Sequence, residues 1–190
     1  MTNHSSSSMT RRGLLRAFAA TTVVAAPTFS NAAGFLRGAG DVRRIRMFSG
    51  RTGEMVDTIY WIEGDYIKEA LKEVNHFMRD WRTDSEKHID TRTIDIMAAS
   101  HNLMGANEPY MMLSGFRSAQ TNAMLRKNSG RRVARNSFHI QGQAADLRLS
   151  SRSVNQMAKA AKACRAGGVG IYSRSNFVHM DCGPLRVWGG

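Results

Sequence analysis

The sequence predicts one small α+β domain with a central antiparallel sheet flanked by helices. A length of 190 residues is enough for one compact domain and little more. A hydrophobic share of 42% can fill a core, which excludes a globally disordered chain. Segments with strand and helix periodicity follow one another without regular alternation. That mixture favours an antiparallel sheet over a doubly wound parallel one.

The first 33 residues have the organisation of an export signal. The adjacent Arg11 and Arg12 precede a short apolar stretch at 17–26 and small residues at 30–33. This order is typical of a twin-arginine signal peptide, cleaved after Ala32 or Ala33, and it predicts a periplasmic protein. The alternative interpretation is the basic amphipathic N-terminus of a cytosolic protein. No apolar run approaches the ~20 residues of a membrane span.

The mature chain begins with a Gly-rich segment at 34–41, which we expect to be a flexible leader, and the domain occupies 42–190. Two alternating segments around a Gly-containing turn predict a hairpin of strands at 42–48 and 55–62. A helix is expected to open at 64–66, because apolar residues then recur every three or four positions up to Trp81. A second helix is predicted at 90–104.

The second half of the domain continues the mixture of elements. A short buried strand at 110–113 leads through a turn at 114–118 into a helix at 119–125, followed by a basic loop at 127–135. The remaining predictions are strands at 144–149, 169–172 and 177–181 and a helix at 153–164, which ends before Gly167 and Gly168.

Charge and cysteine content exclude several classes of protein. The net charge is +12, and +9 remains once the three arginines of the signal are removed. A basic surface suits a polyanion, but no zinc finger, RNA-binding motif or basic zipper is present, so we predict no nucleic-acid partner. Simple solubility is the alternative reason for the charge. Two cysteines exclude a site of four thiolates, and no Gly-rich phosphate loop is found.

Two segments hold the side chains that could carry chemistry. His139 and Asp146 lie seven residues apart around Gly142, and the strand alternation places Asp146 on the polar side of its strand. His179 and Asp181 share one face of another strand. Two imidazoles and one carboxylate, with water in a fourth position, form a catalytic zinc site that suits amide hydrolysis. The alternative interpretation of each residue alone is a surface group or a hydrogen-bonding partner.

The pattern Ser137-x-His139-x-x-Gly142-x-Ala144-x-Asp146 with a downstream His179 resembles the zinc peptidases of the D-Ala-D-Ala carboxypeptidase and VanX type. Within that group the chain is most similar to the YcbK/MepK-like murein endopeptidases. The supporting stretches are Thr52–Glu54, Ser114–Ser118 with Thr121-Asn122, Gly168–Tyr172 and Phe177–Trp188. Together they cover roughly residues 42–188.

The resemblance implies His139, Asp146 and His179 as zinc ligands. It implies an enzyme that hydrolyses peptide bonds in peptidoglycan stem peptides or crosslinks, and the small α+β fold of the D-Ala-D-Ala peptidases (hedgehog-like type). Two other functions stay open. One is a D,D- or L,D-carboxypeptidase, and the other is a non-catalytic module that binds the cell wall or another polyanion. We expect a monomer.

Two further residues are candidates for catalysis. Many carboxypeptidase-type relatives carry an acidic general base three residues before the last His, where this chain has Asn176. Asp181 is then the candidate base, or alternatively it orients His179 by accepting its other N–H. Arg117, in the turn that resembles the family's, is the candidate for contact with substrate or the developing oxyanion. The alternative for Arg117 is a structural bridge.

Cys164 and Cys182 leave a further question open. An exported protein can form a disulfide, which would join the helix at 153–164 to the strand that carries His179. The sequence gives no Cα separation and does not decide the pairing. Ligation of the metal by Cys182 is disfavoured, because its odd spacing from His179 places it on the other strand face.

Overall fold

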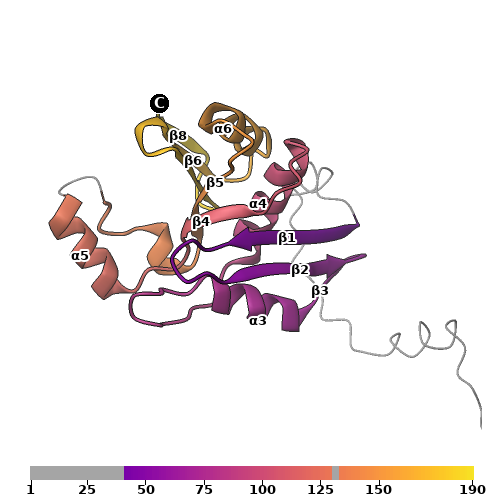
Figure 1. Cartoon of the computed structure of the whole chain (residues 1–190), viewed down its shortest axis with the longest axis horizontal. Coiled ribbons are helices and arrows are strands. Elements are labelled where there is room, and N and C mark those ends of the chain that lie inside the picture. Colours follow the sequence, from indigo (N-terminus) through magenta and orange to yellow (C-terminus); the bar gives the residue numbers. More distant parts are fainter. Residues whose placement is uncertain (1–40, 130–132) are drawn as a thin grey trace, which may run out of the picture. The chain divides into compact units, whose positions relative to one another are not determined.

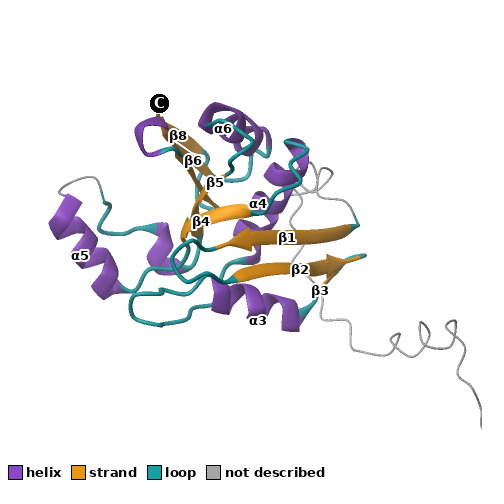
Figure 2. Ribbon diagram, in the orientation of Figure 1, coloured by secondary structure: helices purple, strands orange, loops and turns teal. Residues whose placement is uncertain are grey.

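The computed structural model describes residues 41–129 and 133–190, which form a single α+β domain (Figures 1 and 2). The proposed signal at 1–33 and leader residues 34–40 lie outside the described residues. Within the described part there are four α-helices and one open sheet of eight strands in the order β3-β2-β1-β4-β5-β7-β6-β8. No helix among these residues is long and apolar enough to cross a bilayer.

The eight strands are β1 (Val42–Phe48), β2 (Met55–Ile62), β3 (Asp65–Tyr66), β4 (Tyr110–Ser114), β5 (Ala144–Arg148), β6 (Gly168–Tyr172), β7 (Phe177–Asp181) and β8 (Arg186–Gly189). The helices are α3 (Lys68–Phe77), α4 (Thr91–Leu103), α5 (Ala119–Ser129) and α6 (Val154–Ala163). Two short 3-10 turns, η2 (Phe138–Gln141) and η3 (Ser173–Ser175), precede β5 and β7.

The sheet is mixed, which corrects the expectation of an antiparallel one. The pairs β1–β4 and β6–β8 are parallel, and the other neighbours are antiparallel. The chain between β1 and β4 contains β2, β3, α3 and α4, which is long enough for the crossover that a parallel pair requires. Alternation within a strand carries no information about the direction of its neighbour, so the sequence could not show this.

Three elements differ in detail from the prediction. The segment at 64–66 does not open a helix, because Asp65 and Tyr66 pair with β2 as the edge strand β3. Helix α5 extends to Ser129, into the segment expected to be a loop. Strand β8 was not predicted, since its four residues are too few to show a period.

Helices α3, α4 and α6 pack on one face of the sheet, and the main core lies between them and the strands. In β1 the buried residues alternate as Arg43, Ile45 and Met47, which places their side chains on this helical face. In β5 and β7 the apolar partners Ala145, Leu147, Val178 and Met180 point into the same core. The intervening residues of β5 and β7 therefore lie on the opposite face.

Candidate metal centre

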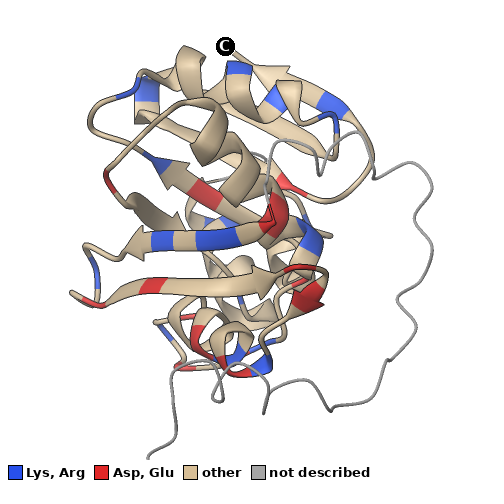
Figure 3. Cartoon of the chain, turned by 90° about the vertical axis from the view of Figure 1, so that its right-hand side faces the viewer, with Lys and Arg blue, Asp and Glu red and all other residues tan. Residues whose placement is uncertain are grey.

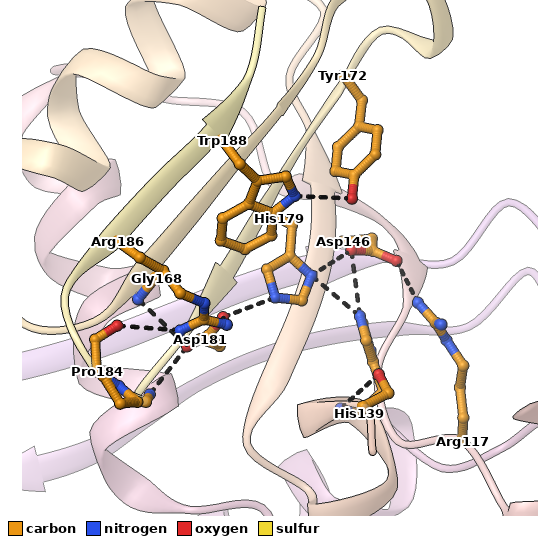
Figure 4. A network of polar contacts seen from close by, with 12 residues as sticks. Arg117, His139, Asp146, Gly168, Tyr172, His179, Asp181, Pro184, Arg186 and Trp188 are labelled. Atoms are coloured by element: carbon orange, nitrogen blue, oxygen red, sulfur yellow. Dashed lines mark hydrogen bonds and ion pairs between the residues drawn. The ribbon is translucent and has the colours of Figure 1, made fainter. Parts of the chain in front are cut away.

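Three residues predicted to be metal ligands lie together on the sheet face opposite the helices. Asp146 on β5 and His179 on β7 are direct partners across the antiparallel ladder, and His139 reaches them from η2 (Figure 4). The Asp146 Oδ1 is 2.9 Å from His179 Nδ1 and 3.2 Å from His139 Nε2. The two imidazole nitrogens are 3.2 Å apart. One ligand atom from each residue lies within 4.8 Å of the others, and all three residues are buried.

The local sequence explains how His139 turns back toward Asp146. Ser137 begins the turn η2, and its hydroxyl accepts a hydrogen bond from the backbone N–H of His139 at 3.3 Å. Gly142 ends the turn with a φ of 71°, in the left-handed region that favours glycine. A Cβ at position 142 would lie 2.4 Å from the backbone oxygen of His88. Both the conformation and the close approach therefore require glycine there.

The outer nitrogens of the two histidines fix which atoms face the centre. His139 Nδ1 is 2.7 Å from the carbonyl oxygen of Gly115, so this nitrogen must carry the proton and donate it. His179 Nε2 is 2.9 Å from a carboxylate oxygen of Asp181 and donates likewise. In the neutral imidazoles, His139 Nε2 and His179 Nδ1 are then unprotonated and direct their lone pairs at each other.

This donor set fits a cation. Two lone pairs and a carboxylate oxygen converge within 3.2 Å of one another when both imidazoles are neutral, and these neutral groups have no hydrogen-bond donor between them. Metal-binding histidines normally hold their other N–H on a carbonyl or carboxylate, as His139 and His179 do here. Two imidazoles and one carboxylate also match the three protein ligands of catalytic zinc sites.

The buried groups influence one another's protonation. Burial lowers the pKa of His139 despite the neighbouring carboxylate. Burial alone would raise the pKa of Asp146, but the two histidines hold it well below its usual value. For His179, burial lowers the pKa, and the hydrogen bonds to Asp146 and Asp181 reverse that effect and raise it. Asp146 is therefore a carboxylate at neutral pH.

Asp181 is completely buried and its two oxygens are fully engaged. Oδ1 accepts hydrogen bonds from the N–H groups of Gly168 and Gly183 at 3.2 and 2.9 Å. Arg186 donates to both oxygens, at 3.0 and 2.6 Å, and His179 donates to Oδ2. Burial would raise the pKa of Asp181, but the bonds to His179 and Arg186 lower it to about 2. The carboxylate is thus held as an acceptor behind His179.

Arg117 lies on the other side of the group. Its Nη2 donates to Asp146 Oδ2 at 2.6 Å, and its Nε donates to the Ser114 hydroxyl at 2.9 Å. The side chain is 11% exposed. Among the described residues, Nη1 has no hydrogen-bond partner. Arg117 therefore orients the carboxylate of Asp146 and has one nitrogen left over.

Three residues that surround His179 had no predicted role: Tyr172, Arg186 and Trp188. Arg186 holds Asp181, and the ring of Trp188 lies 5.2 Å from that of His179. Trp188 Nε1 donates to the Tyr172 hydroxyl at 3.1 Å (Figure 4). All three fall in stretches that resemble the family. However, Arg186 and Trp188 reach the site through the pairing of β8 with β6, and this pairing could not be predicted from the sequence.

The remaining histidines and the cysteines lie outside the group. His76 contacts Glu86, and His101 contacts the carbonyl of Glu108. His4 lies outside the described residues. Cys164 and Cys182 are free thiols in the structure, and Cys164 lies 3.4 Å from the Ser100 hydroxyl. The disulfide that the sequence left open is thus not formed in this structure.

The chain is similar to known peptidoglycan peptidases over most of its length. A model of the M15 peptidases described as peptidoglycan L,D-endopeptidase MepK matches residues 37–188. The peptidoglycan L,D-endopeptidase MepK of Escherichia coli K12 is 43% identical over 137 residues, which cover 72% of this chain and 75% of the relative. The probable peptidoglycan L,D-endopeptidase MepK of Haemophilus influenzae is 37% identical over 140 residues, covering 73% and 75%.

Proposed function

The chain belongs to the family of the peptidoglycan L,D-endopeptidase MepK, and from this premise we propose that it hydrolyses peptidoglycan as a zinc-dependent L,D-endopeptidase. The family membership confirms the resemblance seen in the sequence. The alternatives of a carboxypeptidase and of a non-catalytic binding module have no comparable support.

The observation that carries the proposal is the pair of inward-facing imidazole nitrogens beside the Asp146 oxygen. We propose His139, Asp146 and His179 as the zinc ligands. A zinc ion bound by such residues supplies Lewis acidity toward water and toward an amide carbonyl. The carbonyl of Gly115 accepts a hydrogen bond from His139, and the carboxylate of Asp181 accepts one from His179. These two hydrogen bonds fix the orientation of the histidine ligands.

We propose that Asp181 is a positioning residue rather than the general base. A base must have a lone pair free to accept a proton from water within hydrogen-bond reach. Asp181 has no exposed surface, and its oxygens already accept hydrogen bonds from Gly168, Gly183, Arg186 and His179. These contacts support an orienting role, in which the carboxylate holds the N–H of His179 and raises its basicity as a ligand.

Arg117 has two proposed tasks. Its Nη2 and Nε hold Asp146 and Ser114, which fixes the direction in which the carboxylate presents Oδ1. The free Nη1 is proposed to contact a substrate carboxylate or the oxyanion that develops on the scissile carbonyl. A fixed guanidinium costs no reorganisation during the reaction, which is why such donors are effective.

The family also suggests where the protein works. Since the relatives are named for peptidoglycan hydrolysis, we propose a location in the cell envelope, the periplasm, reached by the twin-arginine route with cleavage near residue 33. Residues 34–41 would then be a leader, and 42–190 a monomeric domain of the zinc D-Ala-D-Ala peptidase (hedgehog-like) type. In the view of Figure 3, Lys and Arg positions are distributed over strands and helices with acidic positions among them.

The proposed function is tested by incubating the mature protein with purified peptidoglycan fragments, with and without a chelator, and identifying the products by mass. Loss of crosslinked dimers that stops with the chelator and returns with zinc is the expected result. Release of single terminal residues would make the protein a carboxypeptidase. No cleavage, together with sedimentation of the protein on intact wall, would make it a binding module.

A further inference from the structure

A cavity of about 710 Å³ lies on the same face of the sheet as the His139/Asp146/His179 group. Its lining includes Arg148, which is two residues beyond Asp146 on β5 and therefore on the same face. Met111, the ladder partner of Arg148 on β4, also lines it, as does Phe48, the partner of Met111 on β1. At about 3.3 Å per residue, the Cα of Arg148 is about 7 Å along the strand from that of Asp146.

The lining combines an apolar wall with a positive charge. Phe48, Pro109 and Met111 supply apolar surface, and the volume falls within the range of small-molecule and peptide sites. The charged residues of the lining are two arginines and one glutamate: Arg148, Arg152 and Glu108. The cavity therefore carries a net positive charge next to the site of the proposed reaction.

Two of these charged groups are already occupied. Glu108 accepts hydrogen bonds from the Ser150 hydroxyl and the Ser151 N–H. Arg152 donates to the carbonyl oxygens of Met104 and Gly105, at 2.9 and 3.2 Å for its Nη2. Neither side chain is left to recognise a ligand.

Arg148 differs from both. Its Nη2 donates to the carbonyl oxygen of Ser175 at 3.0 Å, and this contact fixes the guanidinium at the edge of η3. Its Nε is buried without a partner among the described residues and lies out of reach of a ligand. Its Nη1 has no hydrogen-bond partner among the described residues and is not one of the buried atoms, so it is the donor left for a ligand. A guanidinium nitrogen of this kind forms a charge-assisted hydrogen bond with a carboxylate. Arg148 is thus the charged group in this cavity that has a donor to spare.

We propose that this cavity is a subsite for a carboxylate-bearing residue of the stem peptide, with Arg148 as its specificity-determining residue. The inference rests on the proposed function and names the part of the substrate that lies beside the scissile bond. Stem peptides carry free carboxylates along an extended backbone with short aliphatic side chains. An extended peptide advances by about 3.3 Å per residue, so the carboxylate belongs to a residue about two positions from the bond that is cut.

Asn176 lines the same cavity. Its side-chain amide can donate a hydrogen bond to an anionic ligand and adds no negative charge to the lining. Asn176 is therefore consistent with an anion-binding cavity.

The test measures binding without requiring hydrolysis. The zinc-loaded full chain is titrated calorimetrically with a crosslinked stem-peptide dimer in which the scissile amide is reduced to a secondary amine. A second ligand has the neighbouring carboxylates converted to carboxamides. Arg148→Met removes the charge but keeps a long side chain, and Arg174→Met is the matched control, because Arg174 is an exposed arginine of η3 outside the lining.

The expected result is a Kd about 10–100-fold higher for Arg148→Met than for the wild type with the carboxylate ligand. With the carboxamide ligand the two proteins should bind equally, and Arg174→Met should match the wild type throughout. An equal loss of affinity for both ligands, or no loss of affinity for either, would overturn the proposed subsite. Two controls separate the loss of a ligand contact from the loss of the hydrogen bond to Ser175. Melting temperatures report on the stability of each variant, and Arg148→Lys keeps the positive charge. The hydrolysis assay can fail while Arg148→Met still weakens binding of the carboxylate ligand alone. That combination would refute the proposed function and leave the subsite standing.

Discussion

Two buried polar clusters of the domain, one on each face of the sheet, differ in how their charges are matched. On the helical face, Asp95 of α4 accepts hydrogen bonds from Arg43 at 2.8 Å and from the hydroxyls of Tyr60 and Tyr66 at 2.9 and 2.7 Å. Burial beside this carboxylate raises the pKa of Tyr66 to about 12 and also raises the pKa of Tyr60. Both hydroxyls therefore keep their protons and donate at any physiological pH. The anion has its cation and its donors.

On the opposite face, the His139/Asp146/His179 group has three acceptors directed at one point. The carboxylate is buried in both clusters, Asp95 in one and Asp146 in the other. The difference is that Asp95 has its cation, Arg43, within the chain, although the Nε of Arg43 has no partner among the described residues, whereas the histidine group could hold a cation from outside. A buried anion that pairs with a cation of the chain indicates structure, and an excess of converging acceptors indicates a binding site.

The largest expected effect comes from removing a ligand. His139→Ala or His179→Ala should reduce hydrolysis of peptidoglycan dimers to background, because two remaining ligands hold zinc poorly. His76→Ala, which changes an exposed histidine outside the group, should leave the rate unchanged. Rates are measured by mass spectrometry of the products. A His139 variant that retained wild-type turnover would remove His139 from the site.

The Asp95 cluster should respond in stability instead. Arg43→Met leaves Asp95 without its buried cation and should lower the free energy of unfolding by about 3–5 kcal/mol. Arg44→Met, one residue along β1, breaks an exposed pair with Asp57 and should cost at most about 1 kcal/mol. Denaturant unfolding gives both values. Zinc content per folded molecule should stay unchanged in both variants, and a loss of zinc in Arg43→Met would link the two clusters.

The backbone turn that delivers His139 can be tested with two glycines. Gly53 and Gly142 have φ values of 75° and 71°, but only Gly142 has a backbone atom, His88 O, within 4 Å of where a Cβ would lie. Gly53→Ala should therefore cost about 1 kcal/mol from the conformation alone, and Gly142→Ala about 2–3 kcal/mol. Gly142→Ala should also weaken zinc binding. Equal effects at the two positions would show that the approach to His88 is unimportant.

The smallest effect concerns the orientation of His179. Asp181→Asn should weaken zinc binding by about 10–100-fold, because the histidine loses the carboxylate that holds its N–H. At saturating zinc most of the wild-type turnover should return. Zinc affinity is measured by competition with a chelator, and turnover by product analysis. Normal zinc affinity combined with a turnover that zinc does not restore would instead identify Asp181 as the general base.

Some of this could be predicted from the sequence, for identifiable reasons. The alternation at 177–181 correctly placed His179 and Asp181 on one face, because strand periodicity is a local property. The Gly-centred turn before β5 correctly indicated that His139 could approach Asp146. The convergence itself depends on the pairing of β5 with β7, across more than thirty residues. The residue types suggested a shared zinc site, and the resemblance to a family supported it, but local periodicity could not show the pairing.

Other features could not be predicted from local patterns. The parallel pairs β1–β4 and β6–β8 depend on the path of the chain rather than on the composition of a strand. Arg186 reaches Asp181 through the turn after β7 and the pairing of β8 with β6, neither of which leaves a periodic signal in the sequence. Arg148 shares a strand face with Asp146 in the sequence, yet the free Nη1 of Arg148 is recognisable only in the folded structure, among the residues that it describes.

We propose that one metal ion completes the His139/Asp146/His179 group. The most direct measurement is a zinc titration of the chelator-treated protein, read by elemental analysis after removal of free metal, alongside His139→Ala. The account predicts about one zinc per chain in the wild type and almost none in the variant. A wild-type protein that retains no zinc, or a variant that retains as much as the wild type, would contradict it.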